Sequence, residues 1–586
     1  MNACCRSKTD WCPRSFRCRI AGHRRLAPCC EAVGPTDHRT RKSAILLCLS
    51  FLFATVTHAQ FSYTSDGTSI TITGYTGPGG QVVIPETIDG LPVRIIGSRA
   101  FKDNASLTGV AIPGTVTGIW SEALANCSSL SNVLIPEGVT FVGDGVFRDC
   151  TALTAVTIPT GVFSISSKMF SGCTALMSVT LHPGVMYIGQ YAFSGCNRLA
   201  DCSIPAGVIR LDEAAFYGCS SLASVSIPSG VITIGEETFA GCDNLTDVTI
   251  AEGVTTIDPQ AFCCCRNLAA ITLPSSLTSI EREAFTGCES LSTVRIPENV
   301  VSIDTWAFRG CAAMQAFVVD ERNAGYRSFD GVLFNQDMST LIQCPATREG
   351  AYMIPEGVTR IESGAFFGCG SLTGVWIPVG VTKIYKETFV DCGSLSVVDI
   401  PNGVTVIGEL AFKGCANLLS VSMPPSVHTI QYNAFRSCSG LTRVYLPPSL
   451  GSLGASAFSE CDHLKALYFP GSPPVIVGRQ DIGAANATVF HLPDAPGWDV
   501  SFGGLPTDIW RPRIAAEDDG FGSGPAAFSF DMEWAGERVV IVEASDDPAG
   551  PDWTPLETIT LSDGRGRFDD PTAATAPRRF YRLNAP

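Results

Sequence analysis

The residues of this 586-residue chain best suited to chemistry are its 25 cysteines, because thiols form disulfides, bind zinc and act as nucleophiles. Most of them recur at one constant spacing in two runs, Cys127 to Cys311 and Cys369 to Cys461. Such regularity is typical of an internal column of a repeat, where a small thiol packs well, so we expect buried free thiols. Disulfides, if present, are expected at Cys263-Cys264-Cys265, Cys202 and Cys344. No Cys-x-x-Cys pair faces a second one, which argues against zinc.

The histidines and carboxylates show no catalytic pattern either. His182, His428, His463 and His491 fall in different repeats without a shared spacing, and no nucleophile elbow, phosphate loop or zincin helix is present. A carbohydrate hydrolase would need two carboxylates about 5 to 10 Å apart, and the sequence does not indicate such a pair. Calcium at the C-terminal carboxylates is a weaker hypothesis than an exposed acidic loop; these residues are Asp546, Asp547, Asp552, Asp569 and Asp570. We therefore predict no enzyme activity, no catalytic residue, no metal ligand and no cofactor.

The remaining possibility is that the protein recognises a partner. One column of side chains that point outward, at equivalent positions of successive repeats, indicates where the partner would bind. This column follows the valine of a recurring Leu-x-x-Val-x-Ile-Pro segment and holds only Ser and Thr from Thr157 to Thr272. Further along it becomes aromatic and charged, which is the composition of recognition surfaces. The predicted partner-binding face consists of Arg295, Trp376, Asp399, Arg443, Tyr445, Lys465 and Tyr468. The alternative is that Trp376 and Tyr445 pack on each other or on an inserted segment.

A repeating unit with a 23-residue period must position these side chains. Phenylalanine recurs with this period from Phe147 to Phe308 and again from Phe366 to Phe458. Each unit reads as a short strand ended by proline, then Gly-Val-x-x-Ile and a turn with Ala-Phe-x-x-Cys. One unit cannot bury its own apolar face, but stacked units form continuous columns of side chains. The sequence predicts a repeat solenoid of short parallel strands, roughly 70 Å long at about 4.8 Å per coil.

The whole pattern, Leu-x-x-Val-x-Ile-Pro-x-x-Val-x-x-Ile-x-x-x-Ala-Phe-x-x-Cys, resembles the BspA-like leucine-rich repeats, a family of surface and secreted proteins. The resemblance covers residues 70–470, with departures such as Leu124 for phenylalanine, Ala251 for proline and Cys202 for valine. It implies a leucine-rich repeat solenoid, and an association with adhesion and protein binding.

The chain divides into five expected parts. Residues 1–59 are expected to be a leader and signal peptide, 60–100 an N-terminal cap with a first atypical repeat, and 101–470 the solenoid, with an insert at about 317–352 that decorates it as a hairpin. The expected C-terminal cap is 471–512, and residues 513–586 are expected to form a linker and a small β-sandwich, an all-β module.

The leader indicates export. The segment from Ser43 to Val56 is apolar, follows a basic segment and precedes Thr57-His58-Ala59, so we predict cleavage after Ala59. An uncleaved anchor is the alternative, although the apolar segment is short for a span of about 20 residues. No transmembrane span is expected in the mature chain, and the net charge of −16 argues against nucleic acid as a partner.

These observations predict a secreted or cell-surface, non-catalytic scaffold that binds an extracellular protein or glycan. The alternative function is a structural spacer of the cell envelope, attached through the C-terminal module. The sequence does not indicate an oligomeric state.

Overall fold

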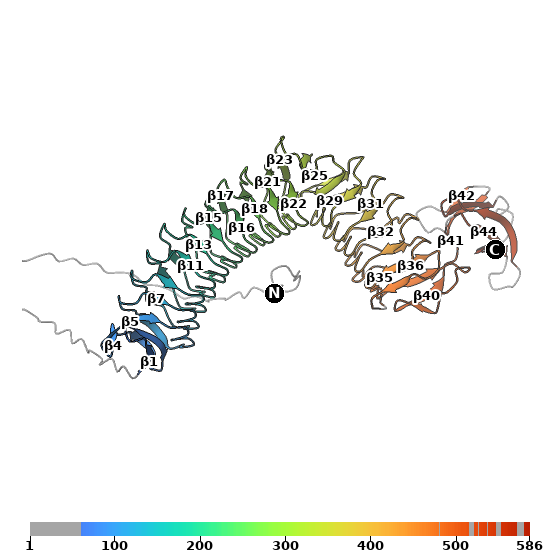
Figure 1. The fold of residues 1–586 in the computed structure, drawn as a ribbon. Coiled ribbons are helices and arrows are strands. Elements are labelled where there is room, and N and C mark those ends of the chain that lie inside the picture. The colour runs from blue at the N-terminus through green and yellow to red at the C-terminus, as the bar shows by residue number, and fades with distance from the viewer. Residues whose placement is uncertain are drawn as a thin grey trace, which may run out of the picture.

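Stacked coils form one long arc, which confirms the predicted leucine-rich repeat solenoid (Figure 1). The computed structural model describes residues 60–479, 481–514, 521–524, 527–535, 537–545, 553–570 and 579–585, and these contain strands and turns but no α-helix. The predicted signal peptide, residues 1–59, lies outside the described residues. None of the described residues belongs to a helix able to cross a membrane.

Most coils contribute one short strand to the inner side of the arc and one to its outer side (Figure 1). The inner strands are β2 (Ile70–Tyr75), β5 (Leu91–Ile96), β7 (Gly118–Ile119), β9 (Phe141–Val142), β11 (Ser164–Ile165), β13 (Tyr187–Ile188), β14 (Arg210–Leu211), β16 (Thr233–Ile234), β18 (Thr256–Ile257), β20 (Ser279–Ile280), β22 (Ser302–Ile303), β26 (Thr340–Gln343), β28 (Arg360–Ile361), β30 (Lys383–Ile384), β32 (Val406–Ile407), β33 (Thr429–Ile430), β35 (Ser452–Gly454) and β37 (Val475–Val477). The outer strands are β3 (Gly80–Val83), β6 (Leu107–Ala111), β8 (Asn132–Leu134), β10 (Ala155–Thr157), β12 (Ser178–Thr180), β15 (Ser224–Ile227), β17 (Asp247–Ile250), β19 (Ala270–Ile271), β21 (Thr293–Ile296), β23 (Ala316–Val319), β27 (Gly350–Met353), β29 (Leu372–Trp376), β31 (Val397–Asp399), β34 (Arg443–Tyr445), β36 (Ala466–Phe469), β38 (Thr488–His491) and β40 (Leu505–Ile509).

Neighbouring strands within the repeats pair in parallel, and each residue lies opposite the equivalent residue of the next coil. Val156 lies opposite Val179 on the outer side, and Ile165 lies opposite Ile188 on the inner side. The inner strands from β11 to β22 form one seven-stranded sheet, whereas the outer strands over the same coils form groups of two or three. This difference fits the curvature, because coils are closer together on the inside of an arc than on the outside.

The core is a stack of equivalent side chains between the two layers of strands. The rings of Phe170 and Phe193 are 5.4 Å apart and 7° from parallel, and the stack continues from coil to coil. The thiols pack beside it, and the Cys173 Sγ donates to the Phe147 carbonyl oxygen of the preceding coil at 3.0 Å. The structure describes 18 cysteines, and all but Cys264 are buried. Burial raises the pKa of the Cys127 thiol to about 12, so these thiols stay protonated.

The inserted segment lies at the top of the arc. The strands β24 (Tyr326–Phe329) and β25 (Val332–Asn335) form an antiparallel hairpin, and β25 also pairs with β26. The hairpin is part of the wall of the solenoid and not a decoration on its surface. Leu333 packs in the core of the first half, whereas Val332 and Phe334 pack in that of the second half. The arc therefore contains two apolar cores that meet at the insert.

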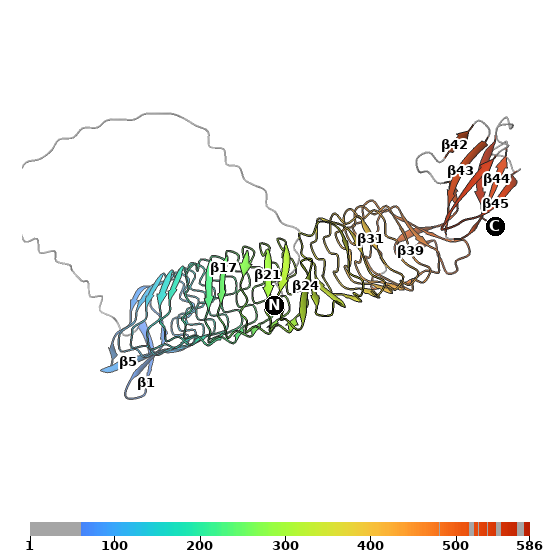
Figure 2. The same cartoon turned by 90° about the horizontal axis from the view of Figure 1, so that it is seen from above.

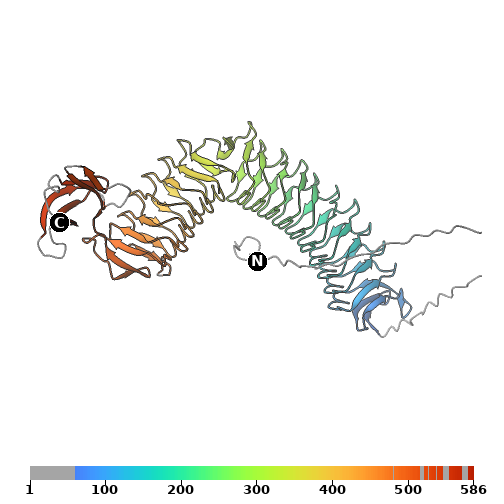
Figure 3. The ribbon, with the colours of Figure 1, turned by 180° about the vertical axis from the view of Figure 1, so that it is seen from behind.

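The two ends of the arc differ. At the N-terminal end, β1 (Phe61–Ser65) pairs antiparallel with β2, and β4 (Thr87–Ile88) pairs antiparallel with β5. At the C-terminal end, β39 (Ser501–Phe502) pairs with β40, and a small all-β module follows, which agrees with the predicted fold class (Figures 2 and 3). Its strands are β41 (Arg513–Ile514), β42 (Phe521–Gly524), β43 (Ala527–Glu533), β44 (Val539–Ser545), β45 (Thr554–Thr560), β46 (Arg565–Asp570) and β47 (Phe580–Asn584), in two sheets.

Candidate functional site

The seven residues of the predicted partner-binding face lie on outer strands or beside them, but they fall into three separate groups. Arg295 is exposed on β21, where it forms an ion pair with Asp320 at 3.2 Å. The insert separates Arg295 from Trp376 and Asp399, which lie opposite each other on β29 and β31. The third group, at the end of the arc, contains Arg443, Tyr445, Lys465 and Tyr468.

The middle group presents an open aromatic surface. Trp376 is 40% exposed, and its register partner on β27, Met353, is 72% exposed. The Trp376 ring lies over Gly374, where an added Cβ would be 3.4 Å from the ring carbon Cη2. The Asp399 carboxylate is exposed on the other side. A tryptophan held beside a flexible methionine and a carboxylate is suited to contact with a protein or a glycan.

The third group faces the C-terminal module, not open solvent alone. Tyr445 stacks on Tyr468 at 4.7 Å, and the ring of Trp510 lies 4.8 Å from that of Tyr468. Tyr468 is only 7% exposed, so the expectation that it points freely outward is wrong, because residues beyond the last repeats cover it. Lys465 remains exposed.

A groove runs between this end of the solenoid and the module. It has a volume of about 950 Å³ and is lined by Tyr445 and Trp510 on one side and by Trp534 and Arg538 on the other. The Trp534 Nε1 donates to the Trp510 carbonyl oxygen at 2.9 Å, and Arg443 approaches Glu533 at 4.0 Å. The groove is therefore built jointly by the two parts of the chain.

The histidines and C-terminal carboxylates form no reactive cluster within the described part of the chain. No three His, Cys, Asp or Glu side chains there are placed to hold a metal ion. Asp546, Asp547 and Asp552 lie outside the described residues. Asp569 and Asp570 belong to β46 and not to a loop, and Asp570 is buried in an ion pair with Arg579 at 2.7 Å.

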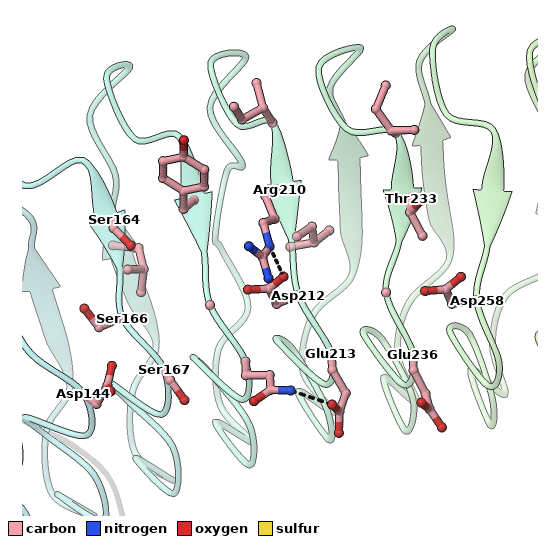
Figure 4. Close-up of a pocket in the computed structure, with 18 residues that line it drawn as sticks. Asp144, Ser164, Ser166, Ser167, Arg210, Asp212, Glu213, Thr233, Glu236 and Asp258 are labelled. Atoms are coloured by element: carbon pink, nitrogen blue, oxygen red, sulfur yellow. Dashed lines mark hydrogen bonds and ion pairs between the residues drawn. The ribbon is translucent and has the colours of Figure 1, made fainter.

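The inner side of the arc carries a second surface, which the sequence reasoning missed. A shallow hollow of about 850 Å³ lies over β11, β13, β14 and β16 (Figure 4). Its carboxylates come from the inner strands and the turns that follow them; they are Asp144, Asp212, Glu213, Glu236 and Asp258. Arg210 is the one cation among the lining residues, and it forms an ion pair with Asp212 at 2.6 Å. The hollow therefore has a net negative charge.

A stripe of exposed apolar side chains runs along the same coils. Phe163, Met186, Ile209 and Ile232 occupy the same position of four successive coils and are 39 to 56% exposed. We call these four residues the inner apolar stripe. In most other coils this position holds threonine, and the signal that would have found the stripe is the replacement of threonine in four successive coils.

A family profile matches the repeat region of the chain. The sequence profile described as BspA type leucine rich repeat region matches residues 94–223, 209–331 and 350–471, which is more than half of the chain. A leucine rich cell surface protein from Faecalibacterium prausnitzii A2-165 is 28% identical, with 70% of this chain and 93% of that chain covered and a TM-score of 0.45. A leucine-rich repeat protein from Bacteroides ovatus ATCC 8483 is 26% identical, with the same coverage and a TM-score of 0.44. No curated protein matches the sequence.

Proposed function

Because the chain belongs to the family of BspA type leucine-rich repeat proteins, we propose that it is a non-catalytic binding scaffold that acts at the cell surface or after secretion. Its partner is an extracellular protein or glycan. A stacked array supports such a role, since it holds side chains on a long and rigid surface. The Faecalibacterium protein that resembles it is described as a cell surface protein.

The observation that carries this proposal is the exposure of Trp376. A large aromatic side chain on an open strand face loses contact with water only when a partner covers it. Asp399 in register beside it adds a charged group that selects among partners. The partner-binding face is centred on these two residues and extends along the outer strands to Tyr445, with Arg295 at its far edge.

The test is binding of the full chain to a panel of matrix proteins and glycans, followed by Trp376→Ala. We expect the variant to bind its partner at least about tenfold more weakly, as is typical for truncation of a central aromatic residue. The matched control is Leu134→Ala, which removes a 73% exposed apolar side chain from the equivalent column of the first half. Equal binding by the Trp376 variant and the unaltered chain would exclude this face.

The same panel addresses the alternative function of a spacer. A chain that binds nothing on the panel, but stays with envelope fractions through its C-terminal module, would behave as a spacer. The single-residue change at Trp376 would then have no effect on its location.

A further inference from the structure

The inner apolar stripe differs from most of its column, in which threonine is the usual residue and Val301 is also apolar and exposed. In other coils the threonine at this position donates from Oγ1 to a carbonyl oxygen of the preceding coil, as Thr255 does to Ile232 and Thr278 does to Thr255, at 3.3 and 3.0 Å. Thr405 in the second half makes the same bond to Thr382 at 3.2 Å. The four apolar residues give up this hydrogen bond and leave hydrocarbon exposed to water.

The stripe is continuous, because its members belong to adjacent coils. The Met186 N–H donates to the Phe163 carbonyl oxygen, and the Ile209 N–H donates to that of Met186, both at 2.9 Å. Two further exposed aromatic residues, Phe141 and Tyr187, lie on the neighbouring inner strands β9 and β13. A single exposed apolar residue needs no explanation, but a row across four coils is typical of a surface that another molecule covers.

The charges beside the stripe indicate which kind of molecule. Glu213 accepts a hydrogen bond from Gln190 at 2.6 Å (Figure 4) and one from Tyr191, also at 2.6 Å, so its charge is held in place by neutral donors and not by a cation. Among the described residues, no cation forms an ion pair with Glu236 or Asp258. Burial, and then the nearby carboxylates of Glu281 and Glu236, raise the pKa of Asp258.

The spacing of the coils indicates the shape of the partner. The stripe lies on the inner side, where hydrogen-bonded neighbouring coils are about 4.8 Å apart, as between Phe163, Met186 and Ile209. An α-helix rises about 5.4 Å per turn, so apolar residues at i, i+4 and i+7 stay within about 2 Å of the coils over the length of the stripe. An extended strand repeats its side chains on one face about every 6.8 Å and loses register with the coils.

We propose that the inner apolar stripe and its acidic flank bind a cationic amphipathic helix of a partner protein. The apolar face of the helix covers Phe163, Met186, Ile209 and Ile232, and its Lys or Arg residues face Glu213, Glu236 and Asp258. This site is independent of the outer partner-binding face, which carries different side chains in other coils.

The test uses a synthetic amphipathic helix of leucine and lysine of about 14 residues, roughly four turns, titrated into the full chain. Two further peptides serve as controls, one with glutamate in place of lysine and one with the same residues in a scrambled order. We expect saturable binding of the first peptide alone, weakened by salt because charge contributes to it. Equal binding of all three peptides would overturn the proposal, since it would show nonspecific adhesion.

The decisive variant is the double change Ile209→Thr and Ile232→Thr. Threonine is the usual residue of this column, so the variant has the same residue as other coils of the protein and is expected to fold. We expect its affinity for the peptide to fall at least about tenfold. Unchanged affinity would overturn the proposal.

Two further variants separate the contributions. Glu213→Gln combined with Glu236→Gln is expected to reduce both the affinity and its salt dependence, and unchanged values would overturn the role assigned to the acidic flank. Trp376→Ala is expected to bind the peptide as the unaltered chain does. A loss in that variant would place the peptide on the outer face and overturn the proposed site.

Discussion

The two halves of the solenoid differ in the face on which exposed apolar side chains occupy equivalent positions of adjacent coils. Before the insert, the inner side carries the inner apolar stripe, and the outer column consists of hydroxyl groups from Thr157 to Thr272. The inner column returns to threonine at Thr255 and Thr278, before the insert, and holds threonine again at Thr359, Thr382 and Thr405 after it, where Met353 and Trp376 are exposed on the outer side. The core columns are the same in both halves, so the comparison shows that the outward positions vary without disturbing the stack.

The inner charges change along the arc as well. The first half has an acidic hollow, whereas the second half places Arg360 and Lys383 over the ring of Tyr385, at 4.7 and 5.2 Å. Arg360 also forms an ion pair with Glu362 at 2.6 Å, so the second half pairs its inner cations with a carboxylate and an aromatic ring, whereas carboxylates outnumber the one cation that lines the hollow of the first half. A single partner that binds both halves in the same way is not expected.

The largest expected effect is a loss of the first half at alkaline pH. Burial raises the pKa of the ladder thiols above the usual 9.0, to about 12 for Cys127 and Cys311. Their contribution to stability is complete below about pH 9 and is lost as the pH rises toward the folded-state pKa, by about 1.4 kcal/mol per thiol and pH unit. The first half contains nine ladder thiols and the second half five, so the first half should unfold at the lower pH.

Hydrogen exchange followed peptide by peptide across an alkaline series measures this difference. A denaturant series at neutral pH is the control, because the thiols are protonated there in both the folded and the unfolded chain. Opening of the second half at the same pH as the first, or below it, would contradict the role of the thiols.

The next largest effect is expected from a substitution that leaves a cavity in the core of one half and not in that of the other. Phe216 and Phe412 are both fully buried, and each stacks between two phenylalanines. We expect Phe216→Ala and Phe412→Ala each to lower the free energy of unfolding by about 3 to 5 kcal/mol. Since the cores meet only at the insert, faster exchange should be confined to the half that contains the change. Equal acceleration in both halves would mean that they unfold as one unit.

The smallest effect on stability is expected when outward residues are exchanged between the two halves. Ile232→Thr gives the first half the residue of the second, and Thr405→Ile does the reverse. Both positions are outside the core, so we expect changes within about 0.5 kcal/mol in thermal or denaturant unfolding. A loss of more than about 2 kcal/mol on Ile232→Thr would show that the stripe stabilises the fold, and would weaken its interpretation as a binding surface.

The repeat itself was predictable because each core position recurs in every unit. Phe170 and Cys173 need the same neighbours as Phe193 and Cys196, so spacing alone gives the register of the stack. The outward direction of Trp376 followed from the same alternation. The burial of Tyr468 beneath Trp510 could not be predicted in this way, because Trp510 lies beyond the periodic region and no repeat spacing relates the two residues. The inner apolar stripe was missed because only the column after the valine was compared between coils.

The hydrogen bonds of the thiol ladder bear on how long such an array can be. The Phe170 carbonyl oxygen accepts the Cys173 N–H of its own coil at 3.0 Å and the Cys196 Sγ–H of the next coil at 3.1 Å. A coil without a successor thus keeps one donor on this oxygen, and a coil without a predecessor leaves only a weak thiol donor unused. A coil can therefore be added at either edge of the stack without leaving a strong hydrogen-bonding group unpaired at this position. The number of coils is limited by the segments that close the two ends. Gain or loss of a whole coil between the inner apolar stripe and the partner-binding face changes the distance between these two surfaces without altering either one.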